Sequence, residues 1–232
     1  MFSYYGSKSK VVNYYPPPKY EKIIEPFAGS ARYSLKYWDR DIRLVDKYEV
    51  IIRIWKWLQQ CSYNDIINLP KFETGVDLRT CNLSEEELLF CGMCAGIAST
   101  QPRFKVSMFA GEQNGRKNRF KNIADNLHKI KHWQIECDDY INLKNEEATW
   151  FIDPPYQFGG HAYIENKIDY EYLGNWCKER MGQTIVCENT KADWLPFTPM
   201  TTMRGANQQF TTEALWSNIQ TNYSNVQTTI NF

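Results

Sequence analysis

Short apolar runs and amphipathic segments alternate along both ends of the chain. Runs of apolar and β-branched residues, each bounded by polar residues, predict buried strands at residues 22–27, 42–45, 133–137, 147–152 and 184–188. Helical periodicity predicts helices at residues 34–38, 49–60 and 169–180. Strands that alternate with helices predict an α/β fold, with a mostly parallel, Rossmann-like sheet and helices on both faces. An antiparallel edge is expected from residues 212–218 and 225–232.

The alternation breaks down in the middle of the chain, between residues 61 and 131. Ser84 and Glu87 form a capping-box pattern, which predicts a helix running to about residue 99. Beyond it we expect a short strand, a turn and a basic helix, at residues 106–110, 111–115 and 116–130. We interpret this stretch as an insertion beside the ligand-binding edge of the sheet.

The tetrapeptide Asp153-Pro154-Pro155-Tyr156 directly follows the strand predicted at residues 147–152. In open α/β sheets, ligands bind at the carboxyl ends of the strands. The Asp153 carboxylate and the Pro154 carbonyl are hydrogen-bond acceptors, the two prolines stiffen the loop, and Tyr156 offers a ring face for a planar base. This group suits an exocyclic amine on an aromatic ring. The structural alternative is an ordinary turn after a strand.

The strand predicted at residues 22–27 runs into the small-residue turn Ala28-Gly29-Ser30-Ala31 and then a helix. This order is typical of the opening of a nucleotide-binding βαβ unit. Asp46 ends the second strand, about 20 positions after the turn, where a carboxylate commonly accepts hydrogen bonds from both ribose hydroxyls. Alternatively, Asp46 is the N-cap of the helix at residues 49–60.

Length and charge limit the interpretation further. The 232 residues suffice for one well-buried domain that has room for an inserted subdomain. The formal net charge is zero, which argues against a protein held on nucleic acid by charge alone. Residues 101–131 nevertheless carry eight basic residues against two acidic ones. This local excess could contact phosphates, or it could be a solvated helical face.

Other features exclude several classes of protein. Seven cysteines without a secretory pattern argue against a disulfide framework. Cys91 and Cys94 form a CxxC without a second one, so we interpret them as core thiols rather than a zinc site, and we expect no metal. No apolar run reaches the length of a membrane span, and the first residues lack a signal-peptide pattern, which predicts an intracellular protein with no membrane partner.

Three stretches, in this order, resemble the AdoMet-dependent adenine-N6 DNA methyltransferases of the bacterial and phage type, which include the GATC-methylating enzymes. They are Tyr4-Tyr5-Gly6-Ser7-Lys8, Glu25-Pro26-Phe27-Ala28-Gly29-Ser30 and Asp153-Pro154-Pro155-Tyr156. Residues 186–189 and 213–218 look like later strands of the family. The resemblance implies methyl transfer from S-adenosyl-L-methionine (AdoMet) to the N6 amine of an adenine that is flipped out of duplex DNA. The family usually has a glycine where this chain has Ala31.

Carried over residue by residue, the resemblance implies two sets of site residues. The catalytic residues would be Asp153, Pro154, Pro155 and Tyr156, with Asp153 and Pro154 binding the target amine and Tyr156 stacking on the base. The cofactor-binding residues would be Tyr4, Lys8, Glu25, Phe27, Gly29, Asp46, Asp139, Tyr140 and Asp153.

The resemblance also implies the organisation and the partners. Residues 1–60 and 119–232 would form the catalytic AdoMet-binding domain, and residues 61–118 the target-recognition region. Double-stranded DNA would be the partner, with DNA contacts from Arg116, Lys117, Arg119 and Lys121, in the cytoplasm of a bacterial cell. Open points are a cognate restriction endonuclease, the oligomeric state and a phage or mobile-element origin. Two alternatives stand beside this prediction: a cytosine-N4 methyltransferase and a DNA-binding relative that has lost catalysis.

Overall fold

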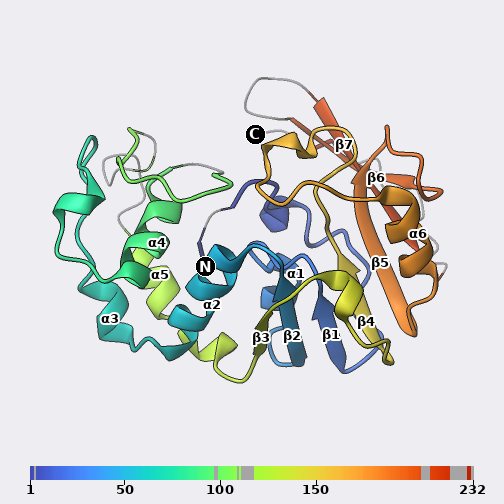
Figure 1. The fold of residues 1–232 in the computed structure, drawn as a ribbon, viewed down its shortest axis with the longest axis horizontal. Helices are drawn as coiled ribbons and strands as arrows, with labels where there is room; N and C mark the ends of the chain where they lie inside the picture. Colours follow the sequence, from blue (N-terminus) through green and yellow to red (C-terminus); the bar gives the residue numbers. More distant parts are fainter. Residues whose placement is uncertain are drawn as a thin grey trace.

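One β-sheet with helices on both faces organises the chain (Figure 1). The computed structural model describes residues 1–2, 4–96, 99–108, 110, 118–204, 210–219 and 229–230, and the statements below concern these residues. Their strands lie in the order β3-β2-β1-β4-β5-β7-β6-β8. The strands are β1 (Lys22–Glu25), β2 (Asp41–Asp46), β3 (Gln134–Cys137), β4 (Ala148–Ile152), β5 (Gly182–Asn189), β6 (Thr198–Arg204), β7 (Phe210–Ser217) and β8 (Thr229–Ile230).

Among the described strands, β7 alone runs opposite to the others, because it pairs antiparallel with both β5 and β6. Strands β3, β2, β1, β4 and β5 run parallel, and β7 pairs antiparallel with β5. The antiparallel strand expected from residues 212–218 is therefore confirmed, but β7 lies between β5 and β6 rather than at the edge of the sheet. In residues 225–232 the expectation is wrong where it can be checked, because β8 pairs parallel with β6. Strand β6 lacks an alternating pattern and contains Pro199, so the sequence did not predict it.

The helices fall between the strands and in the middle of the chain. The α-helices are α1 (Arg32–Lys36), α2 (Glu49–Gln60), α3 (Tyr63–Ile67), α4 (Glu85–Cys94), α5 (Arg119–Ala124) and α6 (Tyr170–Lys178). The 3₁₀ turns are η1 (Lys8–Lys10), η2 (Leu78–Thr80), η4 (Leu127–Ile130), η5 (Tyr140–Asn142) and η6 (Gly160–Ala162). None of the helices in the described residues combines the length and the apolar composition needed to cross a bilayer.

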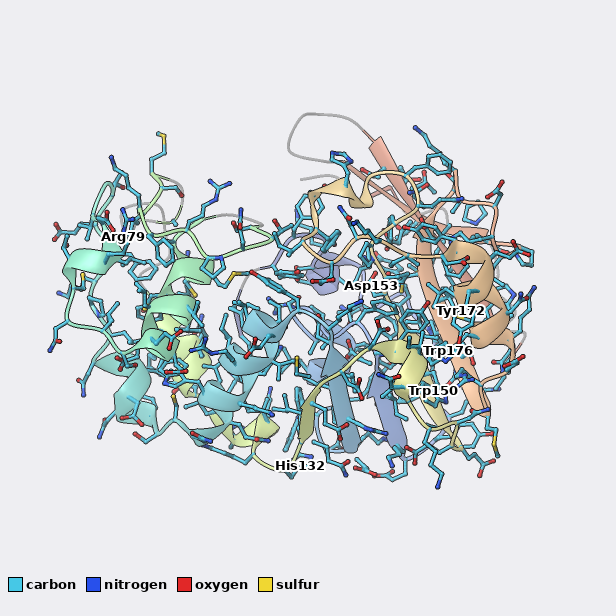
Figure 2. The ribbon with its side chains drawn as sticks, viewed as in Figure 1. Arg79, His132, Trp150, Asp153, Tyr172 and Trp176 are labelled. Carbon is cyan, nitrogen blue, oxygen red and sulfur yellow. The ribbon has the colours of Figure 1, made fainter. Side chains whose placement is uncertain are left out.

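Alternate residues of the central strands enter two separate cores. On β4, Phe151 packs into the core that contains α2, whereas Trp150 and Ile152 pack into the core that contains α6. Side chains of a strand point alternately to its two faces, so β4 must be apolar throughout to be covered on both sides, and all five of its residues are buried. Trp150 meets Trp176 of α6 edge to face at 5.5 Å, while Asp153 lies beyond them (Figure 2).

A helical region flanks the β3 edge of the sheet (Figure 1). It consists of α3, α4, α5 and the described residues that connect them. Phe120 of α5 contacts Phe72 and Phe90 of this region, with ring centroids 5.2 and 6.0 Å apart, so the helical region continues past residue 118. Trp57 of α2 packs on Phe90 at 5.1 Å, which joins the region to the main core.

The middle of the chain only partly follows its pattern. The capping box at Ser84 and Glu87 is confirmed by both of its hydrogen bonds, but the helix ends at Cys94 instead of about residue 99. The prediction of a strand at residues 106–110 is wrong, because the described residues of this range form none. Only a single bridge, between Asp77 and Lys105, forms nearby. The turn predicted at residues 111–115 lies outside the described residues.

Candidate functional site

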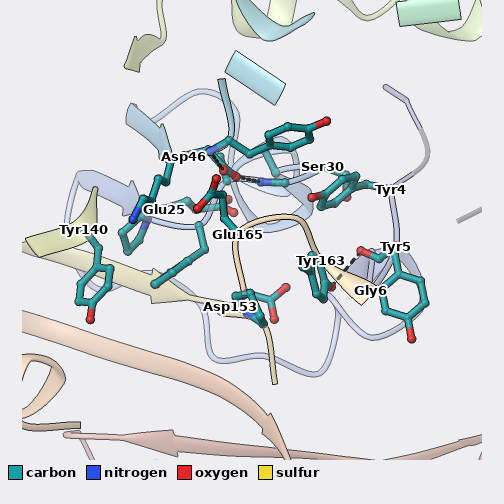
Figure 3. Close-up of a pocket in the computed structure, with 18 of the residues that line it drawn as sticks. Tyr4, Tyr5, Gly6, Glu25, Ser30, Asp46, Tyr140, Asp153, Tyr163 and Glu165 are labelled. Atoms are coloured by element: carbon teal, nitrogen blue, oxygen red, sulfur yellow. Dashed lines mark hydrogen bonds between the residues drawn. The ribbon is translucent and has the colours of Figure 1, made fainter. Parts of the chain in front are cut away.

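A pocket of about 880 Å³, its open mouth included, lies at the carboxyl ends of the parallel strands (Figure 3). Its walls come from the segments that follow β1, β2, β3 and β4, together with the segment before η1 and the loop after residue 162. Parallel strands present their carboxyl ends at one edge, which is why residues far apart in the sequence meet there.

The pocket brings together all the residues predicted to bind a cofactor. They line its wall: Tyr4, Lys8, Glu25, Phe27, Gly29, Asp46, Asp139, Tyr140 and Asp153. Of the predicted catalytic residues, Asp153 and Pro155 also line it, whereas Pro154 and Tyr156 do not. The functional roles of these residues remain predictions at this point.

Asp46 holds the turn after β1 in place. Its Oδ2 accepts a hydrogen bond from Gly29 N at 2.9 Å, and its Oδ1 accepts one from Tyr48 N at 2.9 Å. The predicted alternative, an N-cap role for Asp46, is wrong, because Tyr48 occupies the N-cap of α2. Burial raises the pKa of Asp46 to about 6. A carboxylate offers about four acceptor positions, so two remain for a ligand hydroxyl.

The same turn contains two residues with positive φ. Gly29 has a φ of 43°, and a Cβ there would lie 3.1 Å from the Tyr4 ring, so glycine allows the two segments to approach closely. Ala31 has a φ of 46°, the conformation that a glycine at this position would adopt freely. For alanine it costs on the order of 1–2 kcal/mol. Strain of this kind is found where the surroundings hold the backbone, here through Asp46 and Trp55, which donates to Gly29 O at 2.9 Å.

Lys8 ties the N-terminal segment to Asp153. The Lys8 ammonium lies 2.8 Å from Asp153 Oδ1 and 3.3 Å from Glu213 Oε1, and it donates to Gly6 O at 3.2 Å. Burial alone lowers the pKa of Lys8, but the two carboxylates outweigh it and hold the pKa well above its ordinary value. Lys8 is therefore charged, and its charge is already balanced within the protein.

Asp153 keeps acceptor capacity toward the pocket. Burial raises the pKa of Asp153 to about 6, although Lys8 opposes the shift. Its Oδ1 faces Lys8, while no described residue donates to its Oδ2 or to the carbonyl of Pro154. Two unused acceptors at the end of a strand are what recognition of an amino group requires.

Glu213 of β7 contacts three other side chains in a buried network beside the pocket. Its Oε1 accepts from the hydroxyl of Tyr15 at 2.9 Å and from the hydroxyl of Tyr156, and it faces Lys8. The Lys8 ammonium also lies 4.6 Å from the centre of the Tyr156 ring. Tyr156 is thus bonded at its hydroxyl, and Lys8 covers one face of its ring. A base that stacks on Tyr156 would have to use the other face.

A second carboxylate, Glu188 of β5, fixes the loop after the tetrapeptide. Its Oε1 accepts from Gln157 N at 2.6 Å, and its Oε2 accepts from Asn189 N at 2.7 Å. The Tyr170 hydroxyl donates to the Pro155 carbonyl at 2.8 Å. These bonds restrict the orientation of residues 153–157. The sequence pattern around Glu188 did not reveal that Glu188 has this role.

An aromatic cluster covers one side of the pocket. The Tyr163 ring lies 5.9 Å from that of Tyr4 and 5.4 Å from that of Tyr5, and the Tyr163 hydroxyl donates to Tyr5 O at 3.2 Å (Figure 3). The opposite side carries Phe27 and Tyr140, whose rings are 5.2 Å apart. Beside them, Asp139 caps η5 and pairs with Lys47 at 3.0 Å.

Glu25, at the end of β1, is a deeply buried carboxyl group. Its Oε1 accepts from Ser34 N at 2.6 Å, and its side chain is 2% exposed. Burial raises the pKa of Glu25 to about 8, so the group is largely protonated at neutral pH unless a cation lies beside it. Its position in the pocket wall suits the binding of an ammonium group.

The predicted DNA contacts have different surroundings. Arg116 and Lys117 lie outside the described residues. Arg119 donates to the carbonyl oxygens of Cys94 and Ala110 and lies over the Phe72 ring, so its guanidinium is bonded within the helical region. Lys121 is exposed and pairs with Asp125 at 2.7 Å.

The donor and acceptor set of the pocket fits AdoMet. AdoMet carries an adenosine, a sulfonium and an amino-acid group. The aromatic rings of Phe27 and Tyr140 suit a purine, the Asp46 carboxylate suits ribose hydroxyls, and the acidic groups Glu25 and Asp153 suit the cationic parts. Cys91 and Cys94 are buried in the core, as the sequence predicted. No cluster of three or more metal-ligating side chains occurs in the part of the chain that the structure describes.

Comparison of the chain with known proteins gives one weak structural similarity. No protein-family model and no curated protein matches the sequence. Among solved structures, the chain is similar to yhhF from Escherichia coli, which is described as a candidate methyltransferase. The two share 12% sequence identity and a TM-score of 0.31, over 90% of this chain and 78% of that chain. A likeness this weak says nothing about what the chain acts on.

The strand order itself defines the class of fold. The sheet has five parallel strands in the order β3-β2-β1-β4-β5, and an antiparallel β7 lies between β5 and β6. This is the sheet of the Rossmann-like methyltransferase fold. The predicted fold class is therefore confirmed.

Proposed function

We propose that the protein transfers the methyl group of AdoMet to the N6 amine of adenine in duplex DNA. The observation that carries this proposal is the position of Asp153 and Pro154 at the end of β4. There, Asp153 lines the pocket that fits the methyl donor, and neither Asp153 Oδ2 nor the carbonyl of the adjoining Pro154 accepts a hydrogen bond from any described residue. The resemblance of the three sequence motifs supports adenine as the target.

When bound, AdoMet supplies an electrophilic methyl group on a sulfonium centre. Asp153 Oδ2 and the Pro154 carbonyl would accept the two N–H bonds of the target amine and stabilise positive charge on its nitrogen. Lys8 and Glu188 would keep these acceptors in one orientation, so that most of the rate enhancement comes from alignment. The proton released from the amine would pass to Asp153 or to water.

DNA is the proposed partner because a base must leave the duplex to reach a recessed pocket. The helical region beside the pocket is the proposed target-recognition region, in which the exposed Lys121 is a candidate phosphate contact.

Methyl transfer from labelled AdoMet to unmethylated duplex DNA of mixed sequence, followed by digestion to nucleosides, tests the proposal. We expect label in N6-methyladenine and a loss of about 100- to 1,000-fold or more for Asp153→Asn, which keeps the size of the side chain but removes its charge. The matched control is Asp41→Asn, an exposed aspartate at the start of β2, which should retain activity.

The remaining outcomes decide against parts of the proposal. Label in N4-methylcytosine would establish the cytosine alternative. A protein that binds AdoMet and DNA but transfers no label would be a relative without catalysis.

A further inference from the structure

A half-buried cation without a counter-ion lies at one end of the pocket. Arg32, the first residue of α1, lines the pocket together with Ser7 and Ser30. Its Nε donates to Ser7 Oγ at 3.1 Å, and its Nη2 donates to the carbonyl oxygen of Phe2 at 3.0 Å. Both acceptors are neutral, and no carboxylate of the described residues forms an ion pair with Arg32.

The other cations of the pocket wall differ from Arg32. Lys8 is balanced by Asp153 and Glu213, and Lys47 by Asp139. Lys167 has no ion pair among the described residues, but it is exposed, so water solvates its charge. For Arg32, burial lowers the pKa of the guanidinium and no neighbouring charge restores it.

A charged group that is withdrawn from water without an opposite charge is costly, and the cost is recovered when an anion binds. A guanidinium presents five N–H donors in a planar fork that matches a carboxylate. Two of the donors of Arg32 are used by Ser7 and Phe2, so three remain.

The position of Arg32 identifies the part of the ligand that would supply this anion. Ser30 and Tyr140 lie on opposite sides of the pocket (Figure 3). If the purine lies against Tyr140 and Phe27, an extended AdoMet places its amino-acid group at the Ser30 side, where Arg32 lies.

We propose that Arg32 binds the carboxylate of the amino-acid group of AdoMet. This inference rests on the proposed function and adds a specificity: the pocket selects nucleosides that carry an amino acid over nucleosides that do not. Arg32 would then join the turn after β1 and the N-terminal segment to the ligand.

Calorimetric titration with two ligands tests the inference without a turnover assay. S-adenosylhomocysteine carries the carboxylate, and its decarboxylated analogue keeps the adenosine, the thioether and the amine. We expect the wild-type protein to bind S-adenosylhomocysteine about 10- to 100-fold more tightly than the analogue, as for a charge-assisted hydrogen-bonded pair.

The Arg32→Gln variant should lose this preference. Its affinity for S-adenosylhomocysteine should fall by the same factor, while its affinity for the analogue stays within about two-fold of wild type, which also shows that the pocket is folded. Arg32→Lys should restore part of the preference, because it restores the charge but not the fork. The control is Lys167→Gln, which removes the exposed cation and should leave the preference unchanged.

Four outcomes would overturn the inference. An equal loss for both ligands in Arg32→Gln would make Arg32 a support of the pocket rather than a ligand contact. Loss of the preference in Lys167→Gln instead would assign the carboxylate to Lys167. A wild-type protein that binds both ligands equally would overturn this inference alone, whereas one that binds neither would overturn the proposed function as well.

Discussion

The pocket edge of the sheet and the helical region beside it use charged residues in opposite ways. At the pocket, ionisable side chains are buried, and Lys8 is paired with Glu213: Lys8 is 7% exposed, Glu25 2% and Glu213 4%. In the helical region, ion pairs such as that of Lys121 with Asp125 lie at the surface. Exposed pairs contribute at most about 1 kcal/mol, whereas a buried charge that loses its partner costs several. Substitutions at the pocket should therefore have far larger effects.

Among substitutions that test this difference between the two regions, Glu213→Gln is expected to have the largest effect on activity. The substitution keeps the shape but removes the charge that faces Lys8 and accepts from Tyr156. Because both partners lie beside Asp153, we expect the kcat of methyl transfer to fall about 100-fold with little change in the KM for AdoMet. Steady-state kinetics on unmethylated DNA would measure both constants.

The control for Glu213 is Tyr15→Phe, which removes only the hydroxyl that donates to the same carboxylate. It should lower stability by about 1 kcal/mol and leave kcat within a few-fold of wild type. If Tyr15→Phe lowers kcat as much as Glu213→Gln, the network acts as one structural unit and Glu213 has no particular link to Asp153.

The next effect concerns stability against pH. The pKa of Glu25 is about 8 in the folded protein, against an ordinary value of 4.5, so the folded state holds a proton that the unfolded state releases. The stability this contributes is complete below pH 4.5 and is lost as the pH rises through 8, at up to about 1.4 kcal/mol per pH unit. Urea denaturation should show an unfolding free energy about 1 kcal/mol lower at pH 8 than at pH 7, a range in which Asp46 and Asp153, with pKa values of about 6, are already largely deprotonated.

Glu25→Gln provides the comparison for this pH dependence. Its amide oxygen can still accept from Ser34 N, but it does not titrate. The variant should lose most of the slope between pH 7 and pH 8, above the range in which Asp46 and Asp153, each with a pKa of about 6, titrate. An unchanged slope in the variant would mean that Glu25 is not its source.

A smaller effect is expected in the helical region, at Arg119. Its guanidinium donates to the carbonyl oxygens of Cys94 and Ala110, so Arg119→Met should cost about 1–3 kcal/mol of stability. Lys121→Met, at an exposed neighbouring position, should change stability by less than about 0.5 kcal/mol and reduce the salt dependence of DNA binding by about one phosphate contact. Thermal denaturation and DNA titration at several salt concentrations distinguish the two.

The comparison between the regions would break if Arg119→Met left stability unchanged and altered the preference among DNA sequences. Arg119 would then be a base contact.

The sequence predicted the pocket better than the region beside it, and the reason is geometric. Asp153 follows β4 and Asp46 ends β2, so once both strands are recognised their side chains must lie at the same edge. The apolar runs of these strands are unambiguous because both faces of the sheet are covered. Tyr4 and Lys8 came from the motif resemblance, since nothing local places them beside β4.

The partners that complete the site could not be predicted in this way. Glu213 and Glu188 lie on strands whose patterns read simply as strands, and their role depends on which residues of distant segments face them. Arg32 reads as an ordinary surface residue of a short helix. In the helical region, residues 106–110 have β-propensity, but among the described residues the only bridge nearby joins Asp77 to Lys105, and no described strand pairs with this segment.

The hydrogen bond between Tyr15 and Glu213 affects when the pocket can form during synthesis of the chain. The two residues are 198 positions apart, and β7, which carries Glu213, pairs beside β5 only after the segments between them have been synthesised. At translation rates of about 5–20 residues per second, the ribosome needs roughly 10–40 s to cover that distance. During this interval Lys8 lacks the Glu213 carboxylate, and Tyr156 lacks it for the last 57 positions, once Tyr156 itself has been synthesised. A nascent chain therefore waits for β7 before its pocket takes its final form.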